Sequence, residues 1–138
     1  MIKPHGSDEL NPRFVYDSDK HDALMHEAES LPSIVVSSAA AGNAVMLGGG
    51  YFNPLDGFMN VADAVSCGEN MRTTGGLFFP VPVLNMVDDI SAIKDAKRIA
   101  LRDPNVEGNP VLAVQDVEAI EEISDAQMEA MTKGLFGT

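Results

Sequence analysis

The sequence predicts one α+β domain, because strand-like and helix-like stretches alternate without the regular βαβ rhythm of a doubly wound sheet. Two strand-like runs around a turn-rich insert, residues 98–103 and 111–120, predict a long β-hairpin. A capping box predicts a helix near the C-terminus, because Ser124 is followed one helical turn later by Gln127. With 138 residues the chain has the size of one ordinary domain, so residues 1–138 are expected to form a single domain.

The apolar pattern of the hairpin indicates how it is buried. In the first run Ile99 and Leu101 share one face and Arg98 lies on the other, which is the two-residue period of a half-buried strand. The second run begins with four apolar residues, 111–114, before polar residues appear. We therefore expect the second strand to begin in the core and to end at the edge of the sheet.

The N-terminal third is expected to hold a lead-in, a helix and a strand. The segment up to Arg13 is polar and contains prolines, which predicts an irregular conformation. A helix follows, capped by Asp17 or Ser18 and ended before Pro32. Residues 33–37 then predict a short buried strand.

A second helix and a loop are expected next. The helix is predicted over 39–47, with Ser37 or Ser38 as its N-cap and the glycines 48–50 as its end. In residues 51–59 aromatic and aliphatic side chains alternate with turn-forming residues, which predicts a packed loop.

The remaining elements are a short helix, a strand and the capped C-terminal helix. Asn60 resembles an N-cap, so the short helix is expected over 61–67 with Gly68 as its stop signal. Residues 77–87 are strand-like, but their two prolines lack amide donors and place the strand at an edge. The C-terminal helix is expected to close at Gly134.

Composition excludes several classes of function. Nine Lys and Arg against 21 Asp and Glu give a net charge of −12, so nucleic acid is disfavoured as a partner. The apolar stretches are too short to cross a membrane, and the N-terminal residues lack the apolar region of a signal peptide. The single Cys67 cannot form an internal disulfide. We therefore expect a cytoplasmic protein with no membrane partner.

Residue types that occur in phosphate, metal and catalytic sites are present, but their spacing in the sequence does not fit such sites. The glycines 48–50 follow a helix, whereas a phosphate-binding loop precedes one, so a structural role is favoured. His21 and His26 are five residues apart and cannot share a compact metal site on one helix face. Cys67 has no basic neighbour in sequence and is expected to be a buried structural cysteine. The residues themselves therefore nominate no catalytic, cofactor-binding or metal-binding site.

Five acidic residues at or near the start of the C-terminal helix are expected to form a solvated edge rather than a cation site. They are Glu118, Glu121, Glu122, Asp125 and Glu129.

Four cations that lie close together in sequence are expected to form a local basic spot on this acidic protein. They are Lys94, Lys97, Arg98 and Arg102.

Several strings resemble the ATP sulfurylases, or sulfate adenylyltransferases, and above all those of sulfur-oxidising bacteria. The resemblance runs along the whole chain, and its motifs occur in the order found in that family. The strings are Glu27–Pro32, Leu47–Met59, Phe78–Pro82 and the hairpin segment Arg98–Val114. One departure lies in the loop, where the family often has Ser in place of Asn53 and Gln in place of Asp56.

This resemblance implies an N-terminal PUA-like domain with a small pseudo-barrel of mixed strands and flanking helices. In the family, a separate nucleotidyltransferase domain binds MgATP and joins ATP to sulfate, giving adenosine 5′-phosphosulfate and pyrophosphate, or runs in reverse in sulfur metabolism. Its two nucleotide-binding signatures, Gln-x-Arg-Asn-Pro-x-His and Gly-Arg-Asp-His, do not occur in this chain. Residues 101–104 resemble the second signature but carry Leu and Pro where it has Gly and His.

The resemblance therefore implies a structural or interaction domain that is inactive alone and needs no cofactor of its own. Its expected partner is a catalytic domain, a second subunit or another copy of itself. This partner would contact Phe52, Leu55, Phe58 and the C-terminal helix. The alternative is a stand-alone PUA-like module that binds RNA or a small metabolite, because true PUA domains bind RNA.

Overall fold

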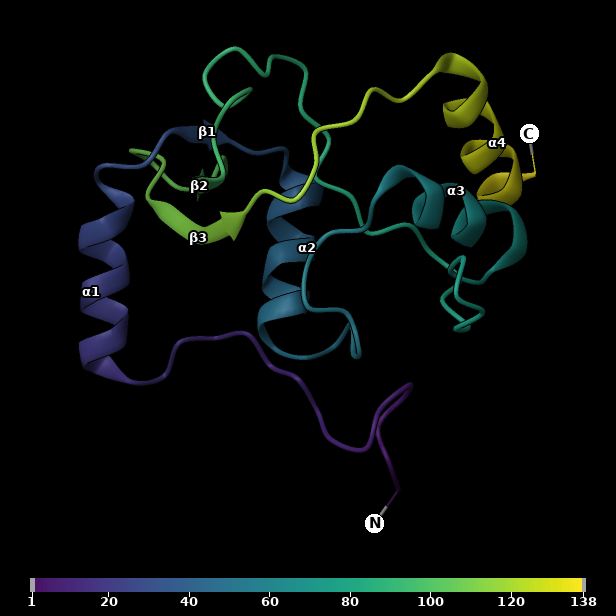
Figure 1. The fold of residues 1–138 in the computed structure, drawn as a ribbon, viewed down its shortest axis with the longest axis horizontal. Coiled ribbons are helices and arrows are strands. Elements are labelled where there is room, and N and C mark those ends of the chain that lie inside the picture. The colour runs from purple at the N-terminus through teal and green to yellow at the C-terminus, as the bar shows by residue number, and fades with distance from the viewer. Residues whose placement is uncertain (1, 138) are drawn as a thin grey trace. The chain divides into compact units, whose positions relative to one another are not determined.

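A computed structural model describes residues 2–137 and shows two compact units (Figure 1). Unit 1 combines Met1–Gly57 with Asn85–Glu118, and unit 2 combines Phe58–Leu84 with Ala119–Thr138. Each unit is therefore built from two stretches of chain that are separated in sequence. The expectation that residues 1–138 form one domain stays a prediction.

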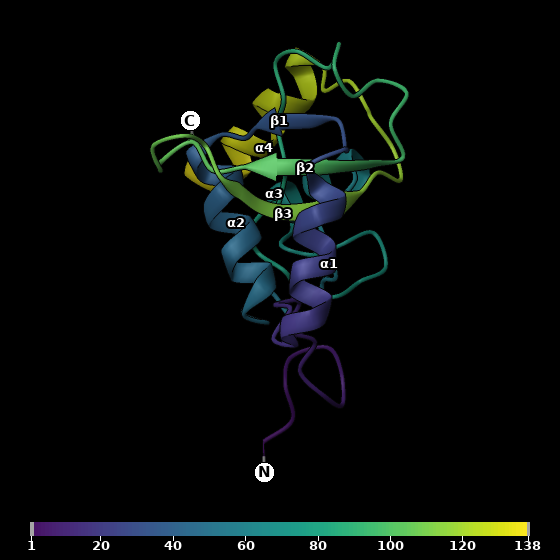
Figure 2. The same ribbon diagram turned by 90° about the vertical axis from the view of Figure 1, so that its left-hand side faces the viewer.

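The core of unit 1 contains a three-stranded mixed sheet in the order β1-β2-β3 (Figure 2). The strands are β1 (Ser33–Val35), β2 (Arg98–Arg102) and β3 (Val111–Asp116). β1 runs parallel to β2, and β2 pairs antiparallel with β3 as the predicted hairpin. Because residues 2–137 contain both helices and strands without a regular βαβ order, the α+β prediction is confirmed.

The central strand β2 is more deeply buried than its sequence suggested. Ile99, Ala100 and Leu101 are each at most 2% exposed, so side chains on both faces of β2 are covered and the half-buried prediction is wrong. The reason is topological, because β2 has a neighbour on each side and helices pack against the sheet. β3 ends at the edge as predicted, but Val111 is half-buried and does not start in the core.

Both helices of unit 1 begin at the predicted caps. α1 (Ser18–Ala28) starts after Asp17, whose carboxylate accepts a hydrogen bond from the Lys20 amide at 2.9 Å. α2 (Ser38–Gly48) starts after Ser37, whose side chain caps it in the same way. Both helices pack against β3 and lie below the strands in Figure 2. The strand expected over 33–37 is shorter and, as an edge strand, less buried than predicted.

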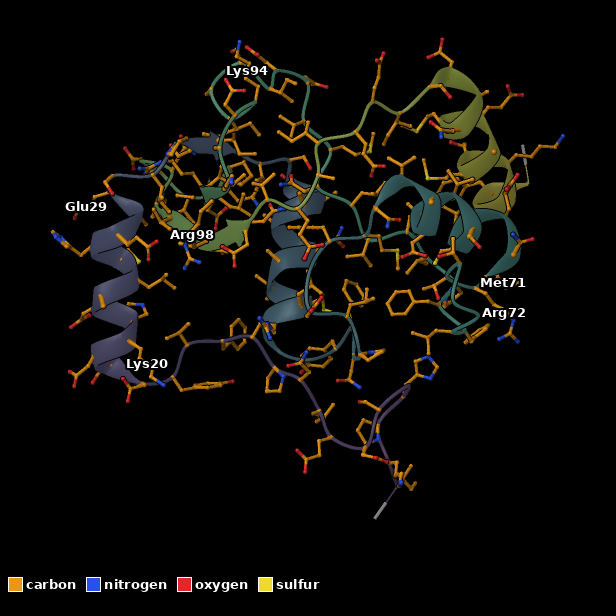
Figure 3. The ribbon with its side chains drawn as sticks, in the orientation of Figure 1. Lys20, Glu29, Met71, Arg72, Lys94 and Arg98 are labelled. Atoms are coloured by element: carbon orange, nitrogen blue, oxygen red, sulfur yellow. The ribbon has the colours of Figure 1, made fainter. Side chains whose placement is uncertain are left out.

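One arginine ties three elements of unit 1 together. Nε of Arg98 on β2 lies 2.8 Å from the Glu27 carboxylate on α1. Its Nη1 donates to Asp116 at the end of β3, at 2.7 Å. Figure 3 shows Arg98 at the sheet beside α1. The arginine thus holds the first helix against the hairpin.

Unit 2 contains the two remaining helices, α3 (Val61–Asn70) and α4 (Asp125–Phe136), which pack against each other. The predicted caps are present in both. Asn60 accepts a hydrogen bond from the Asp63 amide at 2.8 Å, and Ser124 forms the reciprocal capping box with Gln127.

Both predicted helix ends in unit 2 are wrong. α3 continues past Gly68 to a left-handed cap at Met71, and α4 continues past Gly134 to Gly137. The two interior glycines are places of close contact rather than stop signals. A β-carbon on Gly68 would lie 2.9 Å from the Met131 Cα, and one on Gly134 would overlap the Gly68 carbonyl.

The strand predicted over 77–87 is also wrong. In its place the structure has an irregular segment that makes one isolated antiparallel bridge, between Arg72 and Phe78. Pro80 and Pro82 explain the difference, because two missing amide donors on one side of the segment prevent a continuous ladder there.

Candidate functional site

A buried asparagine fixes the N-terminal segment of unit 1. The Asn53 side chain is 6% exposed, and its oxygen accepts a hydrogen bond from the Asn11 amide at 2.9 Å. Its amide group donates to the His5 carbonyl and to the Ser7 hydroxyl, both at 2.7 Å. Sequence reasoning assigned Asn53 no role, because no local pattern indicates a contact with residues so distant in the chain.

The glycines at the end of α2 have the structural role that the sequence favoured. The Gly48 carbonyl accepts hydrogen bonds from the Arg13 and Phe14 amides at 2.8 and 3.0 Å. The amides of Gly49 and Gly50 donate to carbonyls inside the helix. A phosphate-binding loop needs amides that are free to approach the anion. These glycines therefore do not fit a nucleotide phosphate.

The arginine and aspartate of the signature-like string serve the hairpin. Arg102 donates to the Ser33 hydroxyl at 3.1 Å and to the Asn109 carbonyl at 3.2 Å. The Asp103 carboxylate accepts from the Asn105 amide at 2.8 Å. Their hydrogen-bonding groups hold the turn and β1 in place, which supports a scaffold role for residues 101–104.

The predicted partner-contact residues are only half-buried. Phe52 and Leu55 belong to unit 1, where the Leu55 amide donates to the Phe52 carbonyl at 2.8 Å, and Phe58 belongs to unit 2. Other aromatic side chains are far more exposed, and no sequence pattern distinguishes them. They are Tyr16 and Tyr51 in unit 1 and Phe136 in unit 2. The contact role of Phe52, Leu55 and Phe58 stays a prediction.

Cys67 is a buried structural cysteine, as expected. It lies on α3 and is fully buried. Burial raises the pKa of the Cys67 thiol above its ordinary value, and the nearby Asp63 carboxylate raises it further. Since the thiolate is the nucleophilic form, this environment opposes covalent chemistry.

The acidic and histidine residues show no metal-binding geometry. Within residues 2–137, no three His, Cys, Asp or Glu side chains are placed to hold a metal ion together. Glu121 instead accepts a hydrogen bond from the Val61 amide at 3.0 Å, which adds a second cap to α3. His26 is exposed and lies 3.7 Å from Glu29.

The four cations at 94–102 do not form one patch. Arg98 and Arg102 are used by the ion pairs and hydrogen bonds described above. Lys94 lies on the loop before β2, well away from Arg98 in Figure 3. These four residues therefore do not form a cationic stripe of the kind that follows a nucleic-acid backbone.

A groove of about 360 Å³ lies in unit 1 between β1 and the segment 86–89. Apolar residues of both segments line it together with Ser37, Asp88 and Asp89. The lining contains two carboxylates and no cation. Hydrogen bonds from Ser91 lower the pKa of Asp89 below its ordinary value, so its carboxylate is ionised at neutral pH.

None of the helices within residues 2–137 combines the length and apolar character that a bilayer crossing requires.

The comparisons with known proteins identify the family. The profile of the PUA-like domain matches residues 2–138, which is nearly the whole chain. This chain belongs to the PUA-like domain family. Within that family its relatives include the sulfate adenylyltransferase of Allochromatium vinosum, 67% identical over 138 residues, or 100% of this chain and 35% of the relative. That of the Riftia pachyptila sulfur-oxidizing endosymbiont is 59% identical over 100% of this chain and 31% of the relative.

A solved structure has a similar fold. A hexameric APS kinase from Thiobacillus denitrificans superposes with a TM-score of 0.70 at 30% identity, covering 91% of this chain and 24% of that protein. This chain thus spans about a third of the length of the curated relatives and about a quarter of the structural one. The resemblance to ATP sulfurylases is confirmed, and the activity of the longer proteins belongs to the proposals below.

Proposed function

We propose that this PUA-like chain serves as the non-catalytic domain of a sulfate adenylyltransferase. One observation carries the proposal: identity of 67% extends over the whole chain, yet this chain corresponds to 35% of the relative. The residues that most resemble a nucleotide-binding motif form hydrogen bonds within the fold, which supports the proposal; they are Arg102, Asp103 and the glycines 48–50. MgATP would be bound by the remaining part of such an enzyme, and this chain would need no cofactor.

The proposal predicts that the purified chain does not catalyse the reaction of ATP with sulfate. Catalysis of nucleotidyl transfer requires cationic and hydrogen-bonding groups that stabilise charge on the phosphates, and this chain contains neither nucleotide-binding signature. Pyrophosphate release from MgATP and sulfate should stay at background, with a full-length sulfate adenylyltransferase as the positive control. Turnover that co-purifies with the chain and scales with its concentration would overturn the proposal.

The second part of the proposal is a partner, either a catalytic region or another subunit. The relatives are longer, and the structural relative is described as hexameric, which supports both kinds of assembly. Light scattering of this chain, alone and mixed with the separately expressed remainder of the Allochromatium enzyme, tests it. A complex with the remainder, weakened by Phe52→Ala, Leu55→Ala or Phe58→Ala, is expected. Absence of any larger species at high concentration would contradict it.

An independent binding module is the alternative, with RNA or a small metabolite as ligand. The net charge of −12 disfavours RNA, because binding to a polyanion depends on phosphate neutralisation by Lys and Arg. An RNA gel shift at low salt that disappears as salt rises would favour the alternative. We place the protein in the cytoplasm, which suits its single unpaired cysteine.

A further inference from the structure

We propose that the open edge of β1 binds an extended, positively charged peptide segment as an additional strand of the unit 1 sheet. This interaction site goes beyond the proposed function and does not depend on it.

The hydrogen bonds of β1 show which of its backbone groups are free. The Ala100 amide donates to the Pro32 carbonyl at 2.9 Å, and the Val36 amide donates to the Arg102 carbonyl at 3.1 Å. Backbone groups in a strand alternate in direction, so residues 32, 34 and 36 face β2. Ser33 and Val35 therefore direct their amides and carbonyls away from β2, and within residues 2–137 no strand pairs with that edge.

The free edge borders the groove of about 360 Å³ that segment 86–89 forms beside β1. Val35 is 54% exposed and Met86 is 48% exposed, so apolar surface is available next to unpaired backbone groups. An unpaired strand edge beside shallow apolar surface is the arrangement used when a peptide adds to a sheet. Backbone pairing would provide affinity, and alternate apolar side chains of the peptide would cover Val35 and Met86.

The charge of the groove selects the chemistry of the peptide. Asp88 and Asp89 are the charged residues of the lining, and the Ser91 amide holds the Asp89 carboxylate in place at 2.8 Å. A Lys or Arg side chain on the peptide would neutralise this pair. A second copy of the chain fits poorly, because its net charge of −12 would bring like charges together. We therefore assign the edge to a cationic segment of another protein.

The experiment uses the whole chain and a synthetic peptide of about eight residues that alternates Val and Thr and ends in two Arg. Amide chemical shifts of the isotope-labelled protein report both the affinity and the place of binding. Shifts confined to residues 33–37 and 86–89 are expected. The matched control peptide carries Glu in place of Arg and should bind at least about tenfold more weakly.

Two variants of the protein separate backbone pairing from charge. Val35→Pro removes an amide that points away from β2, while the amide of Val36 that pairs with β2 is kept. It should lower the affinity about tenfold, whereas Val35→Thr should bind nearly as wild type because its amide is intact. The double variant Asp88→Asn and Asp89→Asn should weaken binding of the Arg peptide. It should not weaken binding of the Glu peptide.

The proposal survives a folding defect of Val35→Pro, because backbone pairing can be removed from the peptide instead. A peptide N-methylated at alternate residues on its pairing edge should lose binding to the unchanged protein, and one methylated on the opposite edge should keep it. The proposal is overturned if the Arg peptide causes no shifts at 33–37 at millimolar concentration. It is equally overturned if Val35→Pro dissociates a dimer of the chain alone, which would assign the edge to a second copy.

Discussion

A β-carbon placed on Gly134 would overlap the carbonyl oxygen of Gly68, so helices α4 and α3 meet at two residues that have no side chains. The same contact brings Gly68 against Met131, which is 4% exposed in the core of unit 2. Alanine is ordinarily preferred to glycine inside a helix. Here the absence of a methyl group is what allows the two helices to pack.

Replacing either glycine with alanine should therefore destabilise the protein. Gly134→Ala and Gly68→Ala are each expected to lower the free energy of unfolding by about 1–3 kcal/mol, because the added methyl must push the helices apart. Urea denaturation followed by circular dichroism measures this. The control is Gly42→Ala on α2, where a β-carbon meets nothing within 4 Å and a gain of up to about 1 kcal/mol is expected. If Gly68→Ala and Gly134→Ala changed the free energy of unfolding no more than Gly42→Ala does, the contact between α3 and α4 would not be tight.

Loss of the Asn53 side chain should release the N-terminal segment. Asn53→Ala removes three hydrogen bonds and leaves the Asn11 amide without its acceptor, which should cost about 2–4 kcal/mol. Limited proteolysis should then cut within residues 5–12 much faster than in the wild type. Asn70→Ala, at an exposed position, is the control and should change neither rate nor stability. Unchanged protection of residues 5–12 in Asn53→Ala would refute the assignment.

The buried thiol should make stability fall in alkaline solution. The pKa of Cys67 is raised in the folded state, so the fold favours the protonated thiol. This contribution is fully present below the unfolded pKa of about 8.5 and is lost as the pH rises through the higher folded value. The melting temperature, measured from neutral to alkaline pH, should therefore fall more steeply for the wild type than for Cys67→Ala. Parallel curves would mean that Cys67 has the same pKa in both states.

The capping box of α4 should contribute measurably to unit 2. Ser124→Ala removes the acceptor of the Gln127 amide and should cost about 1 kcal/mol, whereas Ser124→Asp should largely keep it. Hydrogen exchange at the first turn of α4 is the most direct measurement. Equal protection in both variants would indicate that packing against α3, rather than the cap, holds this end.

Local signals in the sequence predicted where the helices begin, but for α3 and α4 they did not predict where the helix ends. Asp17, Ser37, Asn60 and Ser124 all cap helices as expected, because each cap depends on atoms a few residues away. A glycine is ambiguous by itself: Gly68 and Gly134 resemble stop signals until the opposite helix is known. The strand expected over 77–87 does not form, because two prolines without amide donors prevent the ladder that its apolar pattern predicts.

The candidate sites show the same limit. The scaffold roles of Arg102 and the glycines 48–50 could be inferred, since their patterns did not fit a phosphate site. The burial of Asn53 and the groove beside β1 could not be inferred from the sequence, because each depends on segments far apart in the chain. Their residue types are common in ordinary loops, so only the three-dimensional arrangement distinguishes them.

The pairing of β1 with β2 also determines the order in which the protein can assemble during synthesis. Ser33 aligns with Ala100, and the segment Phe58–Leu84 of unit 2 is translated between them. Unit 1 therefore cannot complete its sheet until β3 has left the ribosome, and α3 cannot pack against α4 until α4, which follows β3, has also left it. Contacts between distant residues form late, so β1 has no neighbouring strand until residues 98–102 have been made. A chain released before the hairpin is complete would be an unpaired strand and three helices, not a smaller version of this domain.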